Sequence, residues 1–145
     1  MRIALGLDHH GLVLKEVVLG HLNGRGAEVV VFGPESGAAE YPVFAEGAGR
    51  AVAGGECGGA VLICGTGAGM SIAANKIRGV RAVCCSESHT ARLAKEHNNA
   101  NAICFGARVV GPDVALGIID AWLDAEFHGG RHANRVNLIH EIEKR

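Results

Sequence analysis

The segment from Val61 to Ser71 constrains the fold of this chain more than any other stretch. It reads VLICGTGAGMS, an apolar run that ends in Cys64 and is followed by glycines at positions 65, 67 and 69. Residues 72–76 then favour a helix, so the pattern predicts a buried strand, a tight loop and a helix start. Alternate glycines let the backbone take positive φ and let a ligand approach the amides. Because the unpaired N–H groups of a helix start attract anions and favour a nearby thiolate, we expect a reactive site here.

Apolar runs and helical stripes alternate along the chain. Two stripes have helical spacing: Leu14, Val17, Val18 and Leu22, then Ala115, Ile118, Ile119 and Trp122. Five uniformly apolar runs are predicted as strands: Ile3–Leu7, Glu28–Phe32, Ala60–Cys64, Arg81–Cys85 and Ala102–Phe105. Such strands, alternating with helices, indicate a parallel sheet covered on both faces. We therefore expect an α/β protein with one three-layer αβα Rossmann-like domain over residues 1–145, a five-stranded parallel sheet and an extra C-terminal helix from about Arg131 to Lys144.

Composition argues against several classes of function. The 145 residues are 48% hydrophobic and 20% charged, and the formal net charge of -1 gives no basis for a nucleic-acid or membrane partner. No apolar run reaches the roughly 18 residues of a membrane helix. We expect no signal peptide, because residues 1–7 lead directly into a strand. The five cysteines are odd in number and lack C-x₂-C spacing, so we expect a cytoplasmic protein with reduced thiols, buried at Cys84, Cys85 and Cys104.

Polar and ionisable residues gather where the predicted strands end. The segments concerned are Asp8–Gly11, Gly33–Pro42, Cys64–Gly69, Ser86–His89 and Gly106–Arg108. Open α/β sheets bind ligands outside the carboxyl ends of their strands. We therefore expect the functional site at this edge of the sheet.

Cys64 and its loop have several interpretations. A cysteine at a strand end can be a core residue, but the glycine loop favours a nucleophile or a general base. The loop could cradle a phosphate, a dinucleotide or an oxyanion. Met70 after the third glycine departs from the dinucleotide fingerprint, although Glu87 could bind a ribose, and the Gly-Lys-Ser/Thr of a P-loop is missing. An oxyanion hole of backbone amides fits best.

Two histidine-containing segments each allow two interpretations. Asp8 is either a cap for the helix that follows it or a site residue, and no further ligand at metal spacing supports His9 and His10 as a metal site. The segment 97–99 either closes a helix with an asparagine in the left-handed conformation or presents His97 as a proton donor or acceptor. The residues alone favour neither interpretation.

Arg131 and Arg135 stand four residues apart, on one face of the predicted C-terminal helix. A pair of this kind is commonly just solvated. After a double glycine, however, two arginines and His132 also make a phosphate clamp, which Arg108 could join.

Together these residues resemble the ribose-5-phosphate isomerase B family, which also includes galactose- and allose-6-phosphate isomerases. The matching segments run from residue 8 to residue 136: Asp8-His9-x-Gly11, Tyr41-Pro42, Cys64-Gly65-Thr66-Gly67-x-Gly69-x-Ser71-Ile72-Ala73-Ala74-Asn75-Lys76, His97-Asn98, Gly106-x-Arg108-Val109-Val110-Gly111 and Gly130-Arg131-His132-x-x-Arg135-Val136. The glycine loop with its Ala-Ala-Asn-Lys tail is the most specific of them. The resemblance implies aldose–ketose isomerisation of a phosphosugar, first of all D-ribose 5-phosphate to D-ribulose 5-phosphate, without metal or organic cofactor.

The resemblance also implies a role for each matching residue. Cys64 is the base that moves a proton between C2 and C1 through an enediolate, and Thr66 with the loop amides holds the oxyanion. His97, with Asp8 nearby, opens the furanose ring. The expected substrate-binding residues are Asp8, His9, Tyr41, Gly65, Thr66, Gly67, Ala68, Gly69, Ser71, Asn98, Arg108, Arg131 and Arg135, of which His9 and the three arginines hold the phosphate. Family members are homodimers, often paired into tetramers, and both subunits of a dimer contribute to each site.

Three alternative functions stay open. A hexose 6-phosphate isomerase, acting on allose or galactose 6-phosphate, needs only a slightly deeper pocket, and the unusual Glu40 and His10 bear on that choice. A non-catalytic phosphosugar-binding module would use the loop as an anion nest. A thiol-dependent acyl-transfer enzyme would form a covalent acyl-cysteine at Cys64.

Overall fold

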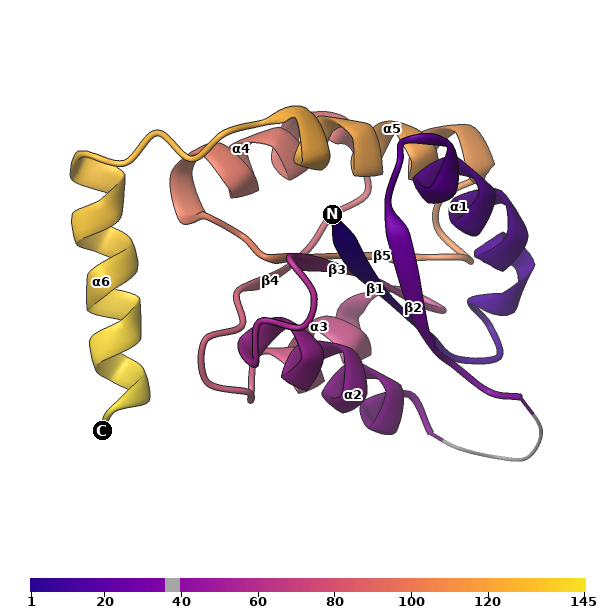
Figure 1. Cartoon of the computed structure of the whole chain (residues 1–145), viewed down its shortest axis with the longest axis horizontal. Coiled ribbons are helices and arrows are strands. Elements are labelled where there is room, and N and C mark those ends of the chain that lie inside the picture. Colours follow the sequence, from indigo (N-terminus) through magenta and orange to yellow (C-terminus); the bar gives the residue numbers. More distant parts are fainter. Residues whose placement is uncertain (36–39) are drawn as a thin grey trace.

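A computed structural model describes residues 1–35 and 40–145, and it consists of a parallel sheet between two layers of helices (Figure 1). The elements in chain order are β1 (Arg2–Leu7), α1 (Leu12–Gly24), β2 (Glu28–Phe32), α2 (Tyr41–Ala53), β3 (Gly59–Cys64), α3 (Ala68–Ala74), β4 (Ala82–Cys84), α4 (Ser88–Asn98), β5 (Ala102–Gly106), α5 (Pro112–Asp124) and α6 (Arg131–Glu143). The strand order is β2-β1-β3-β5-β4, and every pair is parallel. The predicted α/β class, the five parallel strands and the extra C-terminal helix are confirmed.

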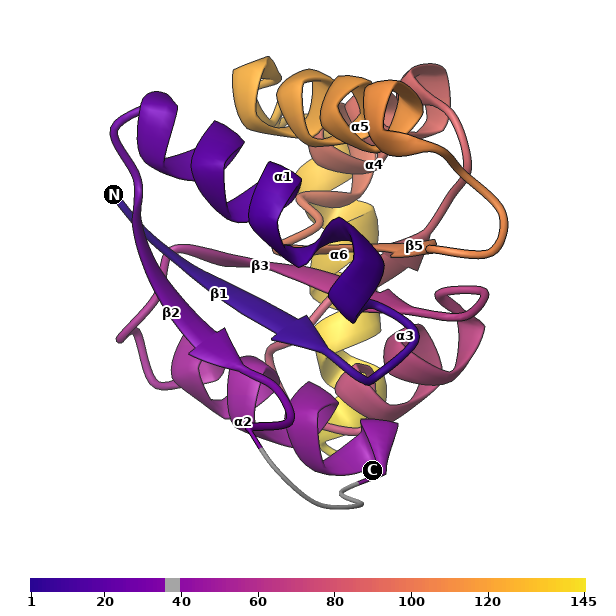
Figure 2. The same ribbon diagram turned by 90° about the vertical axis from the view of Figure 1, so that its right-hand side faces the viewer.

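The sheet has a hydrophobic core on each of its faces (Figure 2). Helices α1, α4 and α5 cover one face, and α2 and α3 cover the other. Along β3 the side chains alternate, so that Ile63 belongs to the first core and Leu62 to the second. Because both faces of the strand are buried, its sequence is apolar throughout instead of alternating with polar residues.

The predicted strands agree with the structure to within one residue at each end. The largest departure is β4, which is shorter than its predicted range of 81–85 and lies at the edge of the sheet. The prediction that Cys84 is buried is wrong, because this edge strand ends at Cys84 and leaves it exposed, while Cys104 on the neighbouring β5 is buried. The predicted loop over 33–42 includes residues 36–39, which lie outside the described residues.

Helix α4 ends as one interpretation of the sequence requires. Asn99 follows its last residue with a positive φ of 47°, the left-handed conformation that closes many helices. This cap turns the chain into β5 and leaves the end of α4 at the opposite edge of the sheet from the carboxyl ends of the strands.

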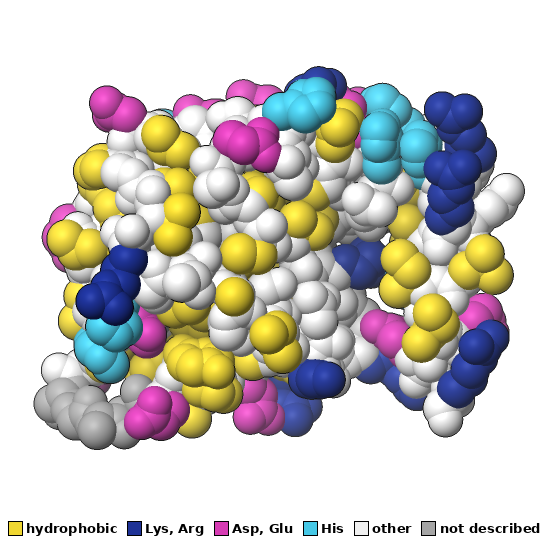
Figure 3. Space-filling view, turned by 180° about the vertical axis from the view of Figure 1, so that it is seen from behind, with side chains coloured by type: hydrophobic (Ala, Val, Ile, Leu, Met, Phe, Trp, Pro, Cys, Tyr) yellow, Lys and Arg dark blue, Asp and Glu magenta, His cyan; other side chains and the backbone are white. Residues whose placement is uncertain are grey.

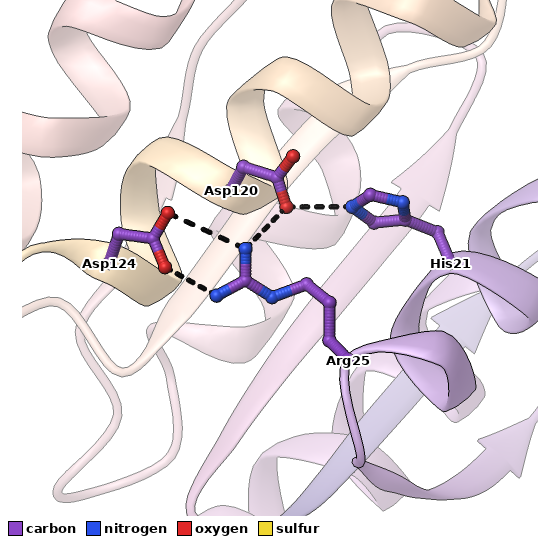
Figure 4. Close-up of polar contacts among 4 residues, drawn as sticks. All are labelled: His21, Arg25, Asp120 and Asp124. Carbon is purple, nitrogen blue, oxygen red and sulfur yellow. Dashed lines mark hydrogen bonds and ion pairs between the residues drawn. The ribbon is translucent and has the colours of Figure 1, made fainter.

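Polar side chains join α1 to α5 on the surface (Figure 4). His21 Nε2 lies 2.6 Å from Asp120 Oδ1, and Arg25 Nη1 donates to the same oxygen at 2.8 Å. Arg25 also pairs with Asp124. The hydrogen bond from Arg25 lowers the pKa of the Asp124 carboxyl, and the same bond raises the pKa of Arg25. This network fixes the two helices against one another at the rim of the first core.

Helix α6 stands at one end of the molecule, apart from the two helical layers (Figure 1). Arg78 Nη2 donates to the Glu143 carbonyl at 2.7 Å, and a cavity of about 430 Å³ lies between α6 and the β4 edge. Leu138 and Ile142 of α6 are 66% and 62% exposed.

Within the described part of the chain, no helix combines the length and apolar character that crossing a bilayer requires.

Candidate active site

A cavity of about 400 Å³ opens at the carboxyl ends of β1 and β3. The residues that line it come from four segments of the chain: Asp8, His9, His10, Glu40, Tyr41, Cys64, Gly65, Thr66, Gly69 and Arg108. Eight of the residues predicted for the site are therefore brought together, at the edge of the sheet where the strand ends were expected to build it.

Cys64 is the last residue of β3 and is 5% exposed. Its Sγ accepts a hydrogen bond from the Gly67 N–H at 3.1 Å. Thr66 lies between them, and its Oγ1 accepts from the Ala68 N–H at 3.3 Å as α3 begins. The loop after β3 therefore folds back over the thiol and fixes the sulfur at the wall of the cavity.

The other four cysteines differ from Cys64 in their environment. Burial raises the pKa of the thiols of Cys57 and Cys104, and it raises that of Cys85 to about 11. The residue Cys84 is exposed, but neighbouring atoms partly desolvate its thiol and raise the pKa there too. These thiols are therefore neutral at physiological pH. Of the cysteines, Cys64 is the one that lines the cavity.

Asp8 precedes the N-cap residue Gly11 and does not itself cap α1. Its Oδ1 accepts a hydrogen bond from the Gly11 N–H at 3.0 Å, which closes the turn that leads into α1. The side chain is 5% exposed and also lines the cavity. The rings of His9 and His10 lie beside it, with centroids 4.4 Å apart. Across the cavity, Arg108 is held by its backbone N–H, which donates to the Gly65 carbonyl at 3.0 Å.

Tyr41 begins α2 and its ring lies over the glycine loop. A Cβ placed on Gly69 would be 2.7 Å from two carbons of that ring, so a larger residue there would displace the Tyr41 side chain. Ser71, which was also predicted to bind substrate, lies one turn into α3 and donates its hydroxyl to the Ala82 carbonyl at 3.4 Å. That contact ties α3 to β4 behind the cavity.

Four predicted site residues lie elsewhere. His97 and Asn98 end α4, and Arg131 and Arg135 occupy the first turns of α6, with both arginines exposed. None of these four lines the cavity beside Cys64. In the view of Figure 3, histidine side chains lie at the upper right beside the terminal helix, at the top edge and at the lower left corner. Because these four residues do not line the cavity, one chain holds the predicted residues in two separate groups.

The second group contains His132, which the sequence placed in a phosphate clamp, and His128, which the sequence did not place in any site. The His132 ring stacks on that of His97, with centroids 4.3 Å apart and an angle of 3°, and His128 packs edge-on against both. Burial lowers the pKa of His132, with His97 and Arg131 adding to the effect. The four-residue spacing of His128 and His132 was a signal, but nothing local linked either of them to His97.

Glu87 does not lie at the glycine loop. Its carboxylate accepts a hydrogen bond from the Thr90 N–H at 2.9 Å and so caps α4, which lowers the pKa of Glu87. The suggestion that Glu87 binds a ribose is not supported by this geometry.

Comparisons with known proteins match nearly the whole chain. Residues 3–139 match the family model described as Ribose/Galactose Isomerase. The chain is 51% identical to Ribose-5-phosphate isomerase B of Escherichia coli (strain K12) over 145 residues, covering 99% of this chain and 97% of that protein.

Two solved structures superpose over nearly the whole chain. Ribose-5-Phosphate Isomerase B of Clostridium thermocellum has a TM-score of 0.96 and 51% identity, covering 99% of this chain and 98% of its own. Ribose-5-phosphate Isomerase B from Mycoplasma genitalium with bound Ribulose-5-phosphate has a TM-score of 0.93 and 39% identity, covering 99% and 97%. This chain belongs to the ribose/galactose isomerase family.

Proposed function

We propose that this protein interconverts D-ribose 5-phosphate and D-ribulose 5-phosphate, with Cys64 as the group that moves the proton. The observation that carries the proposal is the position of the Cys64 sulfur in the cavity wall. Its sulfur is fixed by the Gly67 N–H in the wall of a cavity of about 400 Å³ that also holds Asp8, His9 and Arg108. A base, polar groups for hydroxyls and a cation for phosphate are what a phosphosugar isomerase requires.

The proposed chemistry is a proton transfer within one substrate molecule. The Cys64 thiolate removes the proton from C2 of the open-chain aldose, and the electron pair forms an enediolate. The same sulfur returns the proton to C1, while the hydroxyl proton on O2 is transferred to O1, which gives the ketose. Amides of the 65–69 loop and Thr66 stabilise the oxyanion that develops in between. Because only protons move and no electrons leave the substrate, the proposal needs neither an organic cofactor nor a metal.

His97 and Asp8 take part in the step before this transfer. A histidine side chain can donate a proton to the ring oxygen of the furanose and so open the ring. Asn98 would contact the sugar hydroxyls, and Tyr41 with Ser71 and Ala68 would shape the pocket. His9, Arg108, Arg131 and Arg135 would hold the phosphate, and binding there orients the carbons that react.

This assignment requires two copies of the chain, because one copy keeps the two groups of residues apart. We propose a homodimer, or a tetramer of paired dimers, in which the α4–α6 group of one subunit completes the cavity of the other. Helix α6 supports this arrangement, since it stands away from the layers and exposes Leu138 and Ile142. A symmetric dimer would bury that apolar face twice.

The three alternative functions predict different outcomes when a phosphosugar enters this cavity. A hexose 6-phosphate isomerase would keep the mechanism and change the sugar. A non-catalytic binding module would bind phosphosugar without turning it over. A thiol acyl-transfer enzyme would accumulate an acyl group on Cys64. For the location, we propose the cytoplasm, where the free thiols described here stay reduced.

The test is a chelator-treated assay with ribose 5-phosphate, and with allose and galactose 6-phosphates in parallel. Turnover of the pentose phosphate is expected, and Cys64→Ala should lower kcat by about 100- to 10,000-fold while phosphosugar binding persists. Cys57→Ala removes a buried thiol from the core outside the cavity and is the matched control. An unchanged kcat in Cys64→Ala, or a covalent acyl-cysteine, would contradict the role of Cys64 as the base.

A further inference from the structure

Three histidines meet at the end of the molecule opposite the Cys64 cavity. His97 is on the last turn of α4, His128 is in the segment between α5 and α6, and His132 is in the first turn of α6. One possible ligand nitrogen of each ring lies within 4.8 Å of the other two. The part of the chain that the structure describes offers no second group of this kind.

The fold holds these three side chains in place from different directions. The His128 N–H donates to the Glu96 carbonyl at 3.0 Å, which ties the segment between α5 and α6 to the end of α4. His132 is 8% exposed and lies flat against His97, whereas His128 is exposed at the rim. The cluster is therefore anchored on its inner side and open to solvent on its outer side.

The spacing is close to what a tetrahedral zinc ion requires. Zinc–imidazole bonds of about 2.0–2.1 Å at tetrahedral angles place the nitrogens about 3.4 Å apart. The candidate nitrogens lie within 4.8 Å of one another, and the stacked rings of His97 and His132 must tilt toward a common point to bind one ion. Three protein ligands and one position open to solvent are the coordination set of many zinc sites.

The three imidazole nitrogens determine which metal ions the site can bind. Imidazole suits zinc, copper and nickel, while calcium and magnesium require oxygen ligands. Arg131 and Arg135 oppose a cation here through their charge. The Glu96 carboxylate lies on the same side, with Oε2 3.8 Å from His128 Nε2, but it also pairs with Arg92 at 3.1 Å and so offsets only part of this effect.

We propose that His97, His128 and His132 form a binding site for a borderline divalent transition-metal ion, with Zn²⁺ as the occupant, and that the bound ion inhibits the enzyme. Binding of Zn²⁺ requires the free nitrogen of His97. The inhibitory part rests on the proposed function, because there His97 must reach the ring oxygen of the substrate. Zn²⁺ and the sugar phosphate therefore exclude one another.

Equilibrium dialysis of the full chain against Zn²⁺ tests the site independently of catalysis. His128→Gln should weaken binding by about 100-fold and leave the metal-free isomerase activity unchanged, because His128 has no place in the proposed mechanism. His89→Gln, which removes an exposed histidine elsewhere on α4, should bind Zn²⁺ like the wild type. Equal affinities of wild type and His128→Gln would overturn the site.

Co²⁺ serves as a spectroscopic probe for the same site. The Co²⁺ complex should show d–d absorption without a thiolate charge-transfer band, and His128→Gln should lose it. A thiolate band would assign the ion to cysteines and overturn the proposal.

In the activity assay, Zn²⁺ should inhibit competitively with ribose 5-phosphate, a chelator should restore turnover, and His128→Gln should need about 100-fold more Zn²⁺. Binding that depends on His128 but does not inhibit would overturn the link to His97. Should the chain lack isomerase activity, the dialysis result would still decide the metal site.

Discussion

At the scale of single residues, the loop between β3 and α3 depends on glycines that are required for different reasons. Gly67 has a φ of 84° and donates its N–H to Cys64. A Cβ on Gly67 would lie 2.8 Å from backbone atoms of Phe105, which cannot move away. A Cβ on Gly69 would meet the ring of Tyr41, a side chain that is 38% exposed. The first glycine is therefore needed by the fold, and the second by the shape of the cavity.

This difference predicts separate effects of two alanine substitutions. Gly67→Ala should lower the free energy of unfolding by about 1–3 kcal/mol, because it combines backbone strain with a clash against backbone atoms. Gly69→Ala should leave stability nearly unchanged and impair catalysis, because the displaced Tyr41 ring alters the cavity. Urea unfolding and steady-state kinetics of both variants check this. Equal losses of stability would contradict the assignment.

The residues whose role depends on a short segment were predictable from the sequence. Cys64, Thr66 and Gly67 stand together because a strand, a turn and a helix start follow one another in eleven residues. Glu87 also acts within one short segment, because it accepts the Thr90 N–H and caps α4, and the comparison with a dinucleotide fingerprint did not consider this cap. The partnership of His97 with His132 was hidden, since it joins the end of α4 to the start of α6.

At the scale of elements, burial on both faces of the sheet made the strands easy to recognise. The bounds of β4 were harder to predict. This strand lies at the edge of the sheet, has only three residues and exposes Cys84. The network between α1 and α5 could not be predicted, because His21 and Arg25 are separated from Asp120 and Asp124 by about a hundred residues and exposed charges carry little pattern.

The α1–α5 network predicts how stability depends on pH. Because Arg25 lowers the pKa of Asp124 below its usual value of 3.8, the pair stabilises the folded state above that pH and this contribution is lost as the pH falls through the folded pKa. Asp124→Asn should therefore be less stable than the wild type near pH 7. The difference should disappear on acidification.

Urea unfolding of both proteins across a pH series measures this difference. Glu16→Gln, at an exposed acid on α1, is the control and should show no such pH dependence. A difference between Asp124→Asn and the wild type that persists unchanged in acid would show that the Arg25 pair is not its source. Added salt should reduce the difference, because both groups of the pair are solvated.

At the scale of the whole molecule, the order of the strands decides where the site residues lie. The sequence predicted five strands but no order, because all five have similar apolar patterns. The observed order places β1 beside β3 and so brings Asp8 next to Cys64. The same topology leaves His97 and Arg131 at the opposite edge, which explains why a second subunit is needed for the proposed mechanism.

The most direct test of the account mixes two inactive subunits. One carries Cys64→Ala, and the other carries His97→Ala with Arg131→Ala; they are co-expressed with different tags, and the mixed dimers are quantified. If each site combines residues of both subunits, one site of a mixed dimer contains Cys64, His97 and Arg131 in their wild-type form. The other site carries all three substitutions. Random pairing makes about half of the dimers mixed, so the account predicts about one quarter of wild-type activity. Mixed dimers that form but stay as inactive as either parent would show that each site is built from one chain, and would contradict the account.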